Sequence, residues 1–208
     1  LRPASGYDMV SVRMQSILFR SAHKECAVMY KLCVTEKSAQ NQALLEEAFL
    51  RLALRHNYDD ITISDICREA GLSRKVYYRL FDNKNDVLYA LIDHTLGSFE
   101  AYEPEMEPLH RFFFYFKEQK PLLDALDRSQ CNALLMDRVV RFVLTYNPSS
   151  LTDVYPELLE WDRDTQIFFI SGLFGMMLDW HVRGYDSSVE EISQSLRKLL
   201  SSPLHPYG

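Results

Sequence analysis

The sequence predicts an all-α protein. Its 208 residues include only 7 glycines and 8 prolines, and runs of β-branched residues are scarce. Apolar residues recur every three or four positions along several stretches, which is the period of an amphipathic helix. With 47% hydrophobic residues, the chain can bury one large core or two modest ones. We expect an N-terminal three-helix unit that contains a helix-turn-helix, followed by a larger helical domain.

One stretch in the first half is typical of two short helices joined by a tight turn. Thr62 or Ser64 can cap the first helix, and Gly71 can end it because glycine accepts the left-handed backbone of a C-cap. Ser73 can then cap a second helix over residues 74–81.

The second helix is basic on its outward side. It carries Arg74, Lys75 and Arg79 together with Tyr78, and it has no acidic residue. Two helices joined at a glycine turn, the second basic and exposed, form the arrangement that reads the major groove of DNA. Two packed helices with a solvated charged face are the alternative, and the spacing alone does not separate the two.

Several motifs in this region point to one family. In chain order they are Leu45-x-x-Ala48-Phe49, Thr62-Ile63-x-Asp65-Ile66, Ala70-Gly71-Leu72-Ser73, Tyr78-x-x-Phe81, Lys84 and Val87-Leu88. Together they resemble the DNA-binding signature of the TetR family of bacterial transcription regulators. Two positions depart from that pattern, because Leu80 stands where the family often has histidine and Asn57-Tyr58 where it often has glycine.

The resemblance implies a homodimer that binds a palindromic operator in double-stranded DNA. In this family such a protein is usually a repressor that a small molecule releases. An activator of the same family is one alternative. An all-helical ligand-binding or scaffold dimer without DNA binding is another.

Residue types assign roles at the DNA. The predicted contacts are Thr62, Ser64, Ser73, Arg74, Lys75, Val76, Tyr78, Arg79 and Lys84. The arginine and lysine side chains among them can donate to guanine edges or phosphates, and Val76 can touch a thymine methyl. Thr62, Tyr78 and Lys84 are expected to contact the sugar-phosphate backbone of the DNA. Lys84 also begins a helix, and the free amides at a helix N-terminus favour a phosphate oxygen. Tyr77 is expected to pack inward.

The charge is unevenly distributed along the chain. The net charge of −6 comes entirely from residues 103–208, which contain 16 acidic and 10 basic residues. Residues 1–102 hold 13 of each and are neutral. A neutral first half with a basic helix suits a specific DNA reader with limited non-specific affinity.

We divide the chain into three parts. Residues 1–37 form an N-terminal extension, with an amphipathic helix expected at residues 8–32. Residues 38–84 form the helix-turn-helix DNA-binding domain, and residues 85–208 form a helical effector-binding and dimerisation domain.

The last two helices are expected at residues 165–183 and 189–201, and both have excess apolar surface. Gly172 and Gly175 leave one helix face without side chains, so another helix can approach closely. This pattern and the family resemblance predict a four-helix seam between two subunits. The predicted interface residues are Ile170, Gly172, Phe174, Gly175, Leu178, Ile192, Leu196 and Leu199.

The family resemblance also implies an effector cavity in the acidic half. Candidate lining residues are Tyr89, His94, Phe113, Phe116, Met136, Tyr146, Phe169, Met176 and Trp180. Aromatic and methionine side chains suit a flat or hydrophobic ligand. Ordinary core packing is the alternative for each of them.

Other classes of protein are not indicated. The sequence has no GxSxG elbow, phosphate-cradling glycine loop, HExxH motif or paired Cys/His cluster, so we do not expect an enzyme. The four cysteines have no metal-binding spacing, and they fit reduced thiols. No apolar run approaches the roughly 18 residues of a membrane span. We expect a cytoplasmic protein with no cofactor, metal or membrane partner.

Overall fold

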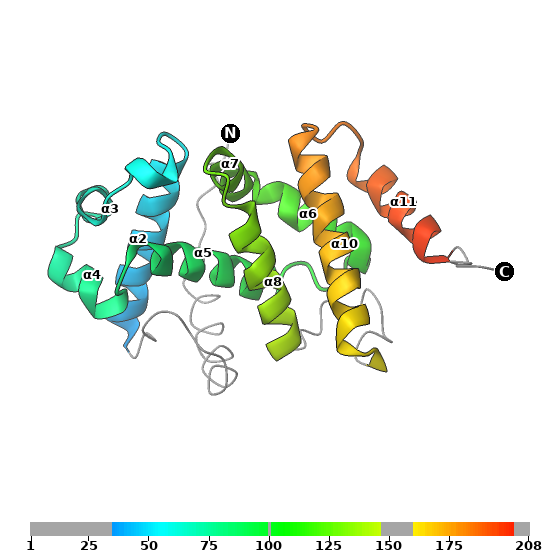
Figure 1. Ribbon diagram of the computed structural model, residues 1–208, viewed down its shortest axis with the longest axis horizontal. Helices are drawn as coiled ribbons and strands as arrows, with labels where there is room; N and C mark the ends of the chain where they lie inside the picture. The colour runs from blue at the N-terminus through cyan, green and yellow to red at the C-terminus, as the bar shows by residue number, and fades with distance from the viewer. Residues whose placement is uncertain (1–34, 100, 147–159, 202–208) are drawn as a thin grey trace.

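The computed structural model describes residues 35–99, 101–146 and 160–201, and every regular element within them is a helix. The elements are α2 (Glu36–Ala53), the 3-10 turn η1 (Tyr58–Asp60), α3 (Ile63–Ala70), α4 (Arg74–Leu80), α5 (Lys84–Phe99), α6 (Pro108–Glu118), α7 (Lys120–Arg128), α8 (Asn132–Tyr146), α10 (Arg163–Val182) and α11 (Val189–Ser201). In Figure 1, α2, α3 and α4 gather at one end, α10 and α11 lie at the other, and α5 runs between them. The all-α prediction is confirmed, whereas the helix expected at residues 8–32 lies outside the described residues.

Helix α2 holds the first three-helix unit together. Thr35 caps it in a reciprocal pair with Ser38, so the helix begins at Glu36, two residues before the domain boundary that we placed at residue 38. Leu45, Phe49 and Leu52 are buried at helical spacing and face α3 and α5. The apolar stripe of α2 is therefore the surface on which the helix-turn-helix is built.

Helix α5 belongs to both halves of the molecule, because it packs against α2 on one side and against α8 on the other. Glu46 of α2 accepts from His94 Nδ1 at 3.0 Å, although Glu46 is only 3% exposed. One residue earlier on α5, Asp93 forms a buried two-bond ion pair with Arg138 of α8. The boundary that we placed after residue 84 thus falls at the first residue of a shared helix.

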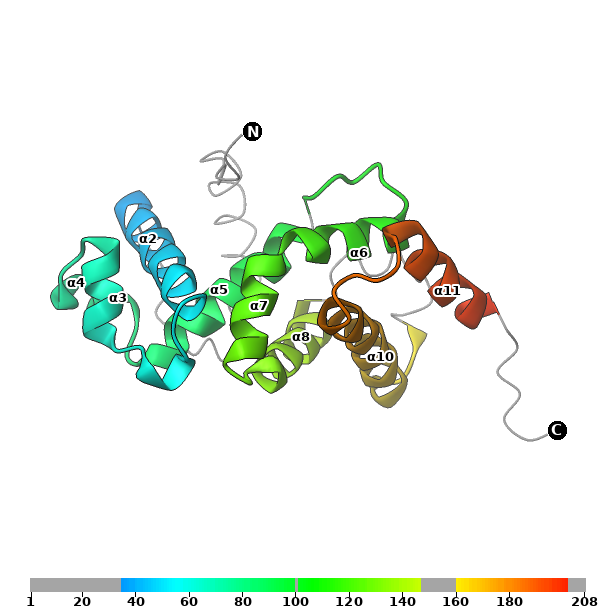
Figure 2. The same cartoon turned by 90° about the horizontal axis from the view of Figure 1, so that it is seen from above.

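The core of the second half is aromatic and centres on α6. Phe112 and Phe116 of α6 lie 5.1 Å and 5.0 Å from the ring of Phe174 on α10, and Phe113 lies 5.8 Å from Trp180. Seen from above, α6 lies along the top of this half, with α7 at one end and α11 at the other (Figure 2). Helices α7, α10 and α11 all pack against α6.

The two C-terminal helices have clear local signals at their ends. Gly184, at φ +70°, follows α10 in the left-handed conformation that glycine adopts at the end of a helix. Ser188 and Glu191 exchange hydrogen bonds between their side chains and backbone amides, which forms a capping box at the start of α11. These caps place the last two helices at nearly the residues expected.

Candidate nucleic-acid interface

The turn between α3 and α4 is formed by short-range contacts. Thr62 Oγ1 accepts from the amide of Asp65, whose carboxylate accepts in return from the amide of Thr62. Gly71 ends α3 at φ +66°, and Ser73 caps α4 by accepting from the amide of Val76 at 3.3 Å. The helix-turn-helix predicted from residue types is therefore present, and of the two candidates for the first cap, Thr62 is the one used.

Helix α4 divides into an inner and an outer face. Tyr77 and Leu80 are buried at 0% and 5% exposure, and the hydroxyl of Tyr77 donates to the carbonyl of Asn83. The outward residues are Arg74, Lys75, Tyr78 and Arg79, all exposed. The outer face of α4 is consequently basic, and this helix contains no carboxylate to offset it.

Two outward side chains of α4 are paired with each other. Arg74 donates to the hydroxyl of Tyr78 at 3.2 Å, and its guanidinium carbon lies 5.8 Å from the centroid of the tyrosine ring. The pair spans one turn of the helix, at i and i+4. It limits the rotamers of a long arginine side chain before any ligand arrives.

The other predicted contacts are partly committed to the fold. The hydroxyls of Thr62 and Ser73 serve as helix caps, and the Thr62 hydroxyl also donates to Asp65 at 2.5 Å. Those Thr62 hydrogen bonds hold the pKa of the Asp65 carboxyl below its usual value. Ser64 is exposed on α3 and Val76 is half-buried. A phosphate oxygen only accepts hydrogen bonds, so Ser73 can still donate its hydroxyl proton to one, whereas the Thr62 proton is already used on Asp65.

Lys84 lies in a different setting from the one that the sequence suggested. Its Nζ donates to the carbonyl of Tyr58 at 2.6 Å and lies 4.0 Å from the centroid of the Tyr58 ring. The free amides expected beside it are occupied, because the amides of Asn85 and Asp86 both donate to Asn83 Oδ1. These two amides are therefore not free to bind a phosphate, and the ammonium group of Lys84 is the group that we assign to that contact.

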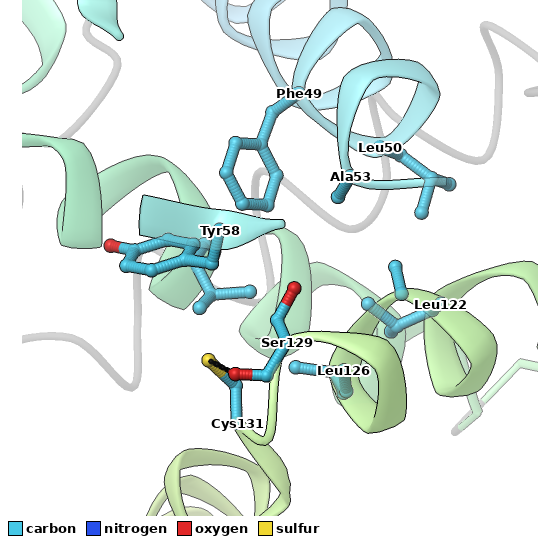
Figure 3. Close-up of a pocket in the computed structure, with 10 residues that line it drawn as sticks. Phe49, Leu50, Ala53, Tyr58, Leu122, Leu126, Ser129 and Cys131 are labelled. Atoms are coloured by element: carbon cyan, nitrogen blue, oxygen red, sulfur yellow. Dashed lines mark hydrogen bonds between the residues drawn. The ribbon is translucent and has the colours of Figure 1, made fainter. Parts of the chain in front are cut away.

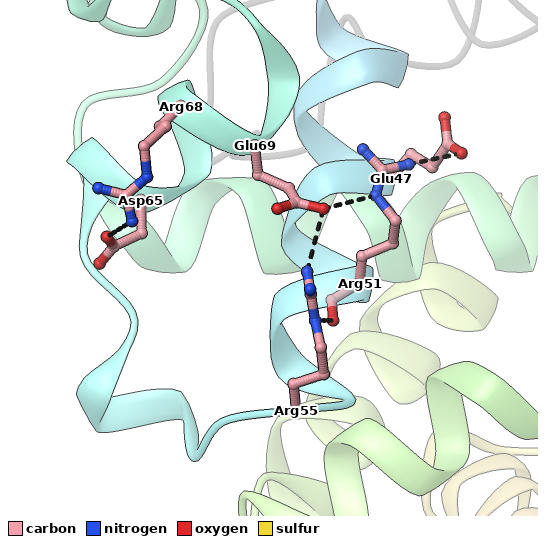
Figure 4. A network of polar contacts seen from close by, with 6 residues as sticks. All are labelled: Glu47, Arg51, Arg55, Asp65, Arg68 and Glu69. Atoms are coloured by element: carbon pink, nitrogen blue, oxygen red, sulfur yellow. Dashed lines mark hydrogen bonds and ion pairs between the residues drawn. The ribbon is translucent and has the colours of Figure 1, made fainter.

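A network of charges fixes α3 against α2 (Figure 4). Glu69 of α3 accepts from Arg51 at 2.9 Å and from Arg55 at 3.0 Å. Arg51 lies in the last turn of α2, and Arg55 lies just after this helix. Arg51 also pairs with Glu47. The Arg51 hydrogen bond, opposed by partial desolvation, holds the pKa of Glu69 below its usual value. Sequence patterns missed this network because its partners are 18 residues apart.

The predicted interface residues fall into two groups. Ile170, Phe174, Ile192 and Leu196 are at most 5% exposed, because they pack into the core of their own subunit. They are therefore removed from the predicted interface. Gly172, Gly175 and Leu199 are exposed and Leu178 is half-buried. Phe168, 77% exposed, and Val182, 63% exposed, share the open face of α10 with the two glycines, and the sequence prediction missed both.

Several residues predicted to line an effector cavity are committed to other contacts in the described part of the structure. Phe113, Phe116 and Trp180 are buried in ring contacts, and Tyr89 packs under the guanidinium of Arg138. His94 is bonded to Glu46. The remaining candidates include the half-buried Met136, Phe169 and Met176, while the side chain of Tyr146 lies outside the described part of the structure.

Among the described residues, a small cavity lies between the two halves (Figure 3). Its volume is about 10 Å³, and its walls are Phe49, Leu50, Ala53, Tyr58, Leu88, Leu122, Ala125, Leu126, Ser129 and Cys131. Residues of α2 and η1 face residues of α7 and of the corner before α8 across this space. It has room for roughly one water molecule, which is too little for an effector.

Among the described residues, no three His, Cys, Asp or Glu side chains gather as a metal site. No helix in the described ranges is long and apolar enough to cross a membrane.

The comparison with protein families agrees with the geometry. Residues 45–91 match the family model described as "Bacterial regulatory proteins, tetR family". The matched segment runs from α2 through the helix-turn-helix into α5. No curated protein matches the chain.

Proposed function

By its residues 45–91 the protein belongs to the tetR family of bacterial regulatory proteins, and we propose that it is a homodimeric repressor. The helix-turn-helix makes it a DNA-binding transcription regulator. The proposed repressor binds a palindromic operator and leaves it when a small molecule occupies the second half. The exposed, carboxylate-free outer face of α4 carries this proposal.

Base reading is assigned to the first turns of α4. Arg74 and Lys75 follow the Ser73 cap directly, and the N-terminal end of a recognition helix is the part that meets base edges. Arg74 and Lys75 donate to guanine O6 and N7, and Val76 can touch a thymine methyl. Tyr78 and Lys84 donate to phosphates, which fixes the position of the helix without reading sequence.

Dimerisation is proposed through the open face of α10. This face carries Phe168 and Val182 around Gly172 and Gly175, where a Cβ would meet nothing within 4 Å inside the subunit. Two such faces can pack at close range and bury the exposed aromatic ring. One helix of 7 residues reads only a few base pairs, whereas two related by a two-fold axis read a palindrome.

Release is proposed to act through α5. This helix packs on α2 and α8, and the Asp93–Arg138 pair makes its attachment to α8 specific. A ligand that shifts α8 therefore shifts α5, and α5 begins four residues after the last residue of α4. The distance between the two α4 helices of a dimer would change as a result.

The test begins with selection of bound sequences from random duplex DNA by the full chain. We expect a palindrome to be enriched. Arg74→Ala should weaken binding to it by about 1–3 kcal/mol and relax the preference at one position of each half-site. Arg128→Ala removes an exposed arginine from α7 and is the matched control, with an expected change within about twofold.

Each outcome has a definite meaning. If no sequence is enriched at low salt, the protein does not read DNA and the proposal is wrong. If Arg74→Ala and Arg128→Ala weaken binding equally, α4 is not the reader. If a single half-site is enriched, the dimeric part of the proposal fails.

A further inference from the structure

Tyr58 holds the start of α5 through three of its groups. Its carbonyl accepts from Lys84 Nζ at 2.6 Å, its ring face lies 4.0 Å from the same nitrogen, and its hydroxyl donates to Asn85 Oδ1. Tyr58 itself lies in η1, between α2 and α3. The proposed phosphate-binding lysine is therefore held by a residue 26 positions earlier in the chain.

This arrangement restrains the lysine side chain. A lysine ammonium sits on four flexible carbons, and much of its rotamer freedom is lost when it binds. The contact with the Tyr58 ring is the attraction of a cation to the negative face of an aromatic ring. One N–H of the ammonium is used on the carbonyl, so two are left for a phosphate oxygen.

The same ring also faces the second half of the molecule. Tyr58 lines the cavity of about 10 Å³ opposite Leu126, Ser129 and Cys131, at the corner between α7 and α8 (Figure 3). Phe49 meets the ring edge-on at 6.0 Å. Since the space holds roughly one water molecule, a small movement of the corner toward η1 would press on Tyr58.

Ser129 lies in the wall of the cavity, and its side chain is not fully packed there. Its Oγ is buried and has no hydrogen-bond partner among the described residues. Its carbonyl accepts from the thiol of Cys131 at 3.3 Å, which fixes the corner next to the cavity. The corner thus contains a hydrogen bond on one side and is separated from Tyr58 by the cavity on the other.

We propose that Tyr58 is a positioning residue that sets Lys84 for its phosphate contact and transmits movements of the α7–α8 corner to it. This inference rests on the proposed function, because it deepens the regulation of the same DNA-binding surface. Ordinary packing of an aromatic side chain beneath α2 is the competing explanation. The two differ in whether the effect of Tyr58 on DNA binding requires Lys84.

A double-mutant cycle at the selected operator separates the two explanations. We expect Lys84→Gln to weaken binding about 5- to 10-fold and to lower the slope of log affinity against log salt by about 1. Tyr58→Leu should weaken binding about 3- to 10-fold in the native background and have no further effect in the Lys84→Gln background. Tyr58→Phe keeps the ring and the carbonyl and should bind like the native protein. If Tyr58→Leu weakens binding by the same factor in both backgrounds, the inference is overturned.

A measurement on the native protein covers the case in which Tyr58→Leu does not fold. The ring current of Tyr58 should shift the ε-methylene protons of Lys84 upfield in the NMR spectrum of the free protein. Loss of that signal in Lys84→Gln assigns it. If no lysine methylene proton is shifted upfield, the ring contact is absent in solution and the inference fails.

Two substitutions at Ser129 test the transmission. Ser129→Val adds volume at the cavity and should weaken operator binding about 3-fold or more, with no effect in the Lys84→Gln background. Ser129→Ala removes the unpaired hydroxyl and should leave binding unchanged. Equal binding by both variants would contradict transmission from the corner. A native protein that selects no DNA sequence would instead refute the proposed function, so the two failures are distinguishable.

Discussion

His94 of α5 links this helix to the DNA-binding half through its side chain. Its Nδ1 lies 3.0 Å from Oε2 of Glu46, a carboxylate on α2 that also accepts from Gln42. Burial lowers the pKa of His94, but the hydrogen bond and charge of Glu46 raise it by more, so the pKa lies above its ordinary value. The sequence placed His94 at an effector cavity, and the structure gives it a partner on α2 instead.

The raised pKa predicts the pH dependence of stability. A histidine whose folded pKa exceeds its unfolded pKa stabilises the fold fully below the unfolded value, near 6.5. That stabilisation is lost as the pH rises through the folded value. We expect urea unfolding to show native protein more stable than His94→Gln by about 1.5–3 kcal/mol at pH 5.5, with the difference shrinking toward pH 8.5.

A second histidine supplies the control for this experiment. His110 lies 3.4 Å from Glu190, but this pair is at the surface, with side chains 32% and 60% exposed. His110→Gln should change stability by less than about 1 kcal/mol across the same pH range. A difference between native protein and His94→Gln that stays constant with pH would show that the Glu46 contact is not ionic.

At the scale of elements, the attachment of α5 to α8 depends on a buried ion pair. The side chains of Asp93 and Arg138 are 5% and 7% exposed, and Arg138 also lies 5.3 Å from the ring of Tyr89. Two charges are costly to bury, so their value lies in fixing which residues of α5 and α8 face each other. The ion pair therefore fixes the position of α5 against α8.

Breaking this pair should be more harmful than removing it altogether. Arg138→Met leaves a carboxylate buried and should lower the free energy of unfolding by about 3–5 kcal/mol. The double variant Asp93→Leu with Arg138→Met should recover most of that loss. Chemical unfolding of the three proteins measures both values. Equal destabilisation by the single and double variants would mean that packing, and not charge, dominates this contact.

The turn of the helix-turn-helix offers a second prediction about elements. Gly71 has φ +66°, and a Cβ there would meet nothing within 4 Å, so Gly71→Ala carries only a backbone penalty. We expect a loss of about 1–2 kcal/mol in unfolding free energy. Because the strain falls between α3 and α4, operator affinity should fall as well.

Gly184 provides the matched comparison, because it has φ +70° and equally open surroundings at the end of α10. Gly184→Ala should cost about the same stability, since the backbone strain is the same. Operator affinity, measured well below the unfolding temperature, should stay near the native value. Equal losses of affinity in the two variants would show that general destabilisation explains the effect of Gly71→Ala.

For the whole molecule, the open face of α10 is the feature that a single subunit leaves unexplained. Phe168 is 77% exposed, which is unusual for a phenylalanine beside two glycines on an apolar helix. Phe168→Glu should leave the subunit folded and weaken dimerisation at least about 100-fold, because it places a carboxylate at the centre of an apolar contact. Sedimentation equilibrium measures the dissociation constant.

Binding to the operator should respond to the same change. Phe168→Glu should lose the preference for a palindrome over a half-site, since one α4 reads only one half. Ala133→Glu adds the same charge at an exposed position of α8 and is the control. A native protein that is monomeric, or a Phe168→Glu variant that dimerises normally, would contradict the proposed interface.

Local features of the molecule were predictable from the chain itself. The caps at Thr62, Gly71 and Ser73 depend on residue type and on contacts within a few positions, so they could be proposed from the sequence. The inward position of Tyr77 and the outward basic residues of α4 followed from the helical period.

Contacts between distant residues were not predictable in the same way. Helix α10 is apolar around much of its circumference, so periodicity could not tell whether Phe174 or Phe168 faces outward. The contact of Tyr58 with Lys84 depends on where η1 lies against α5. Local propensity does not determine how two elements pack against each other when their contacting residues are 26 positions apart. Helix caps and the helical period depend on residues within one or two turns of each other, so they determine where each helix begins and ends. The packing of all the helices together decides which helix faces are buried and which lysine contacts Tyr58.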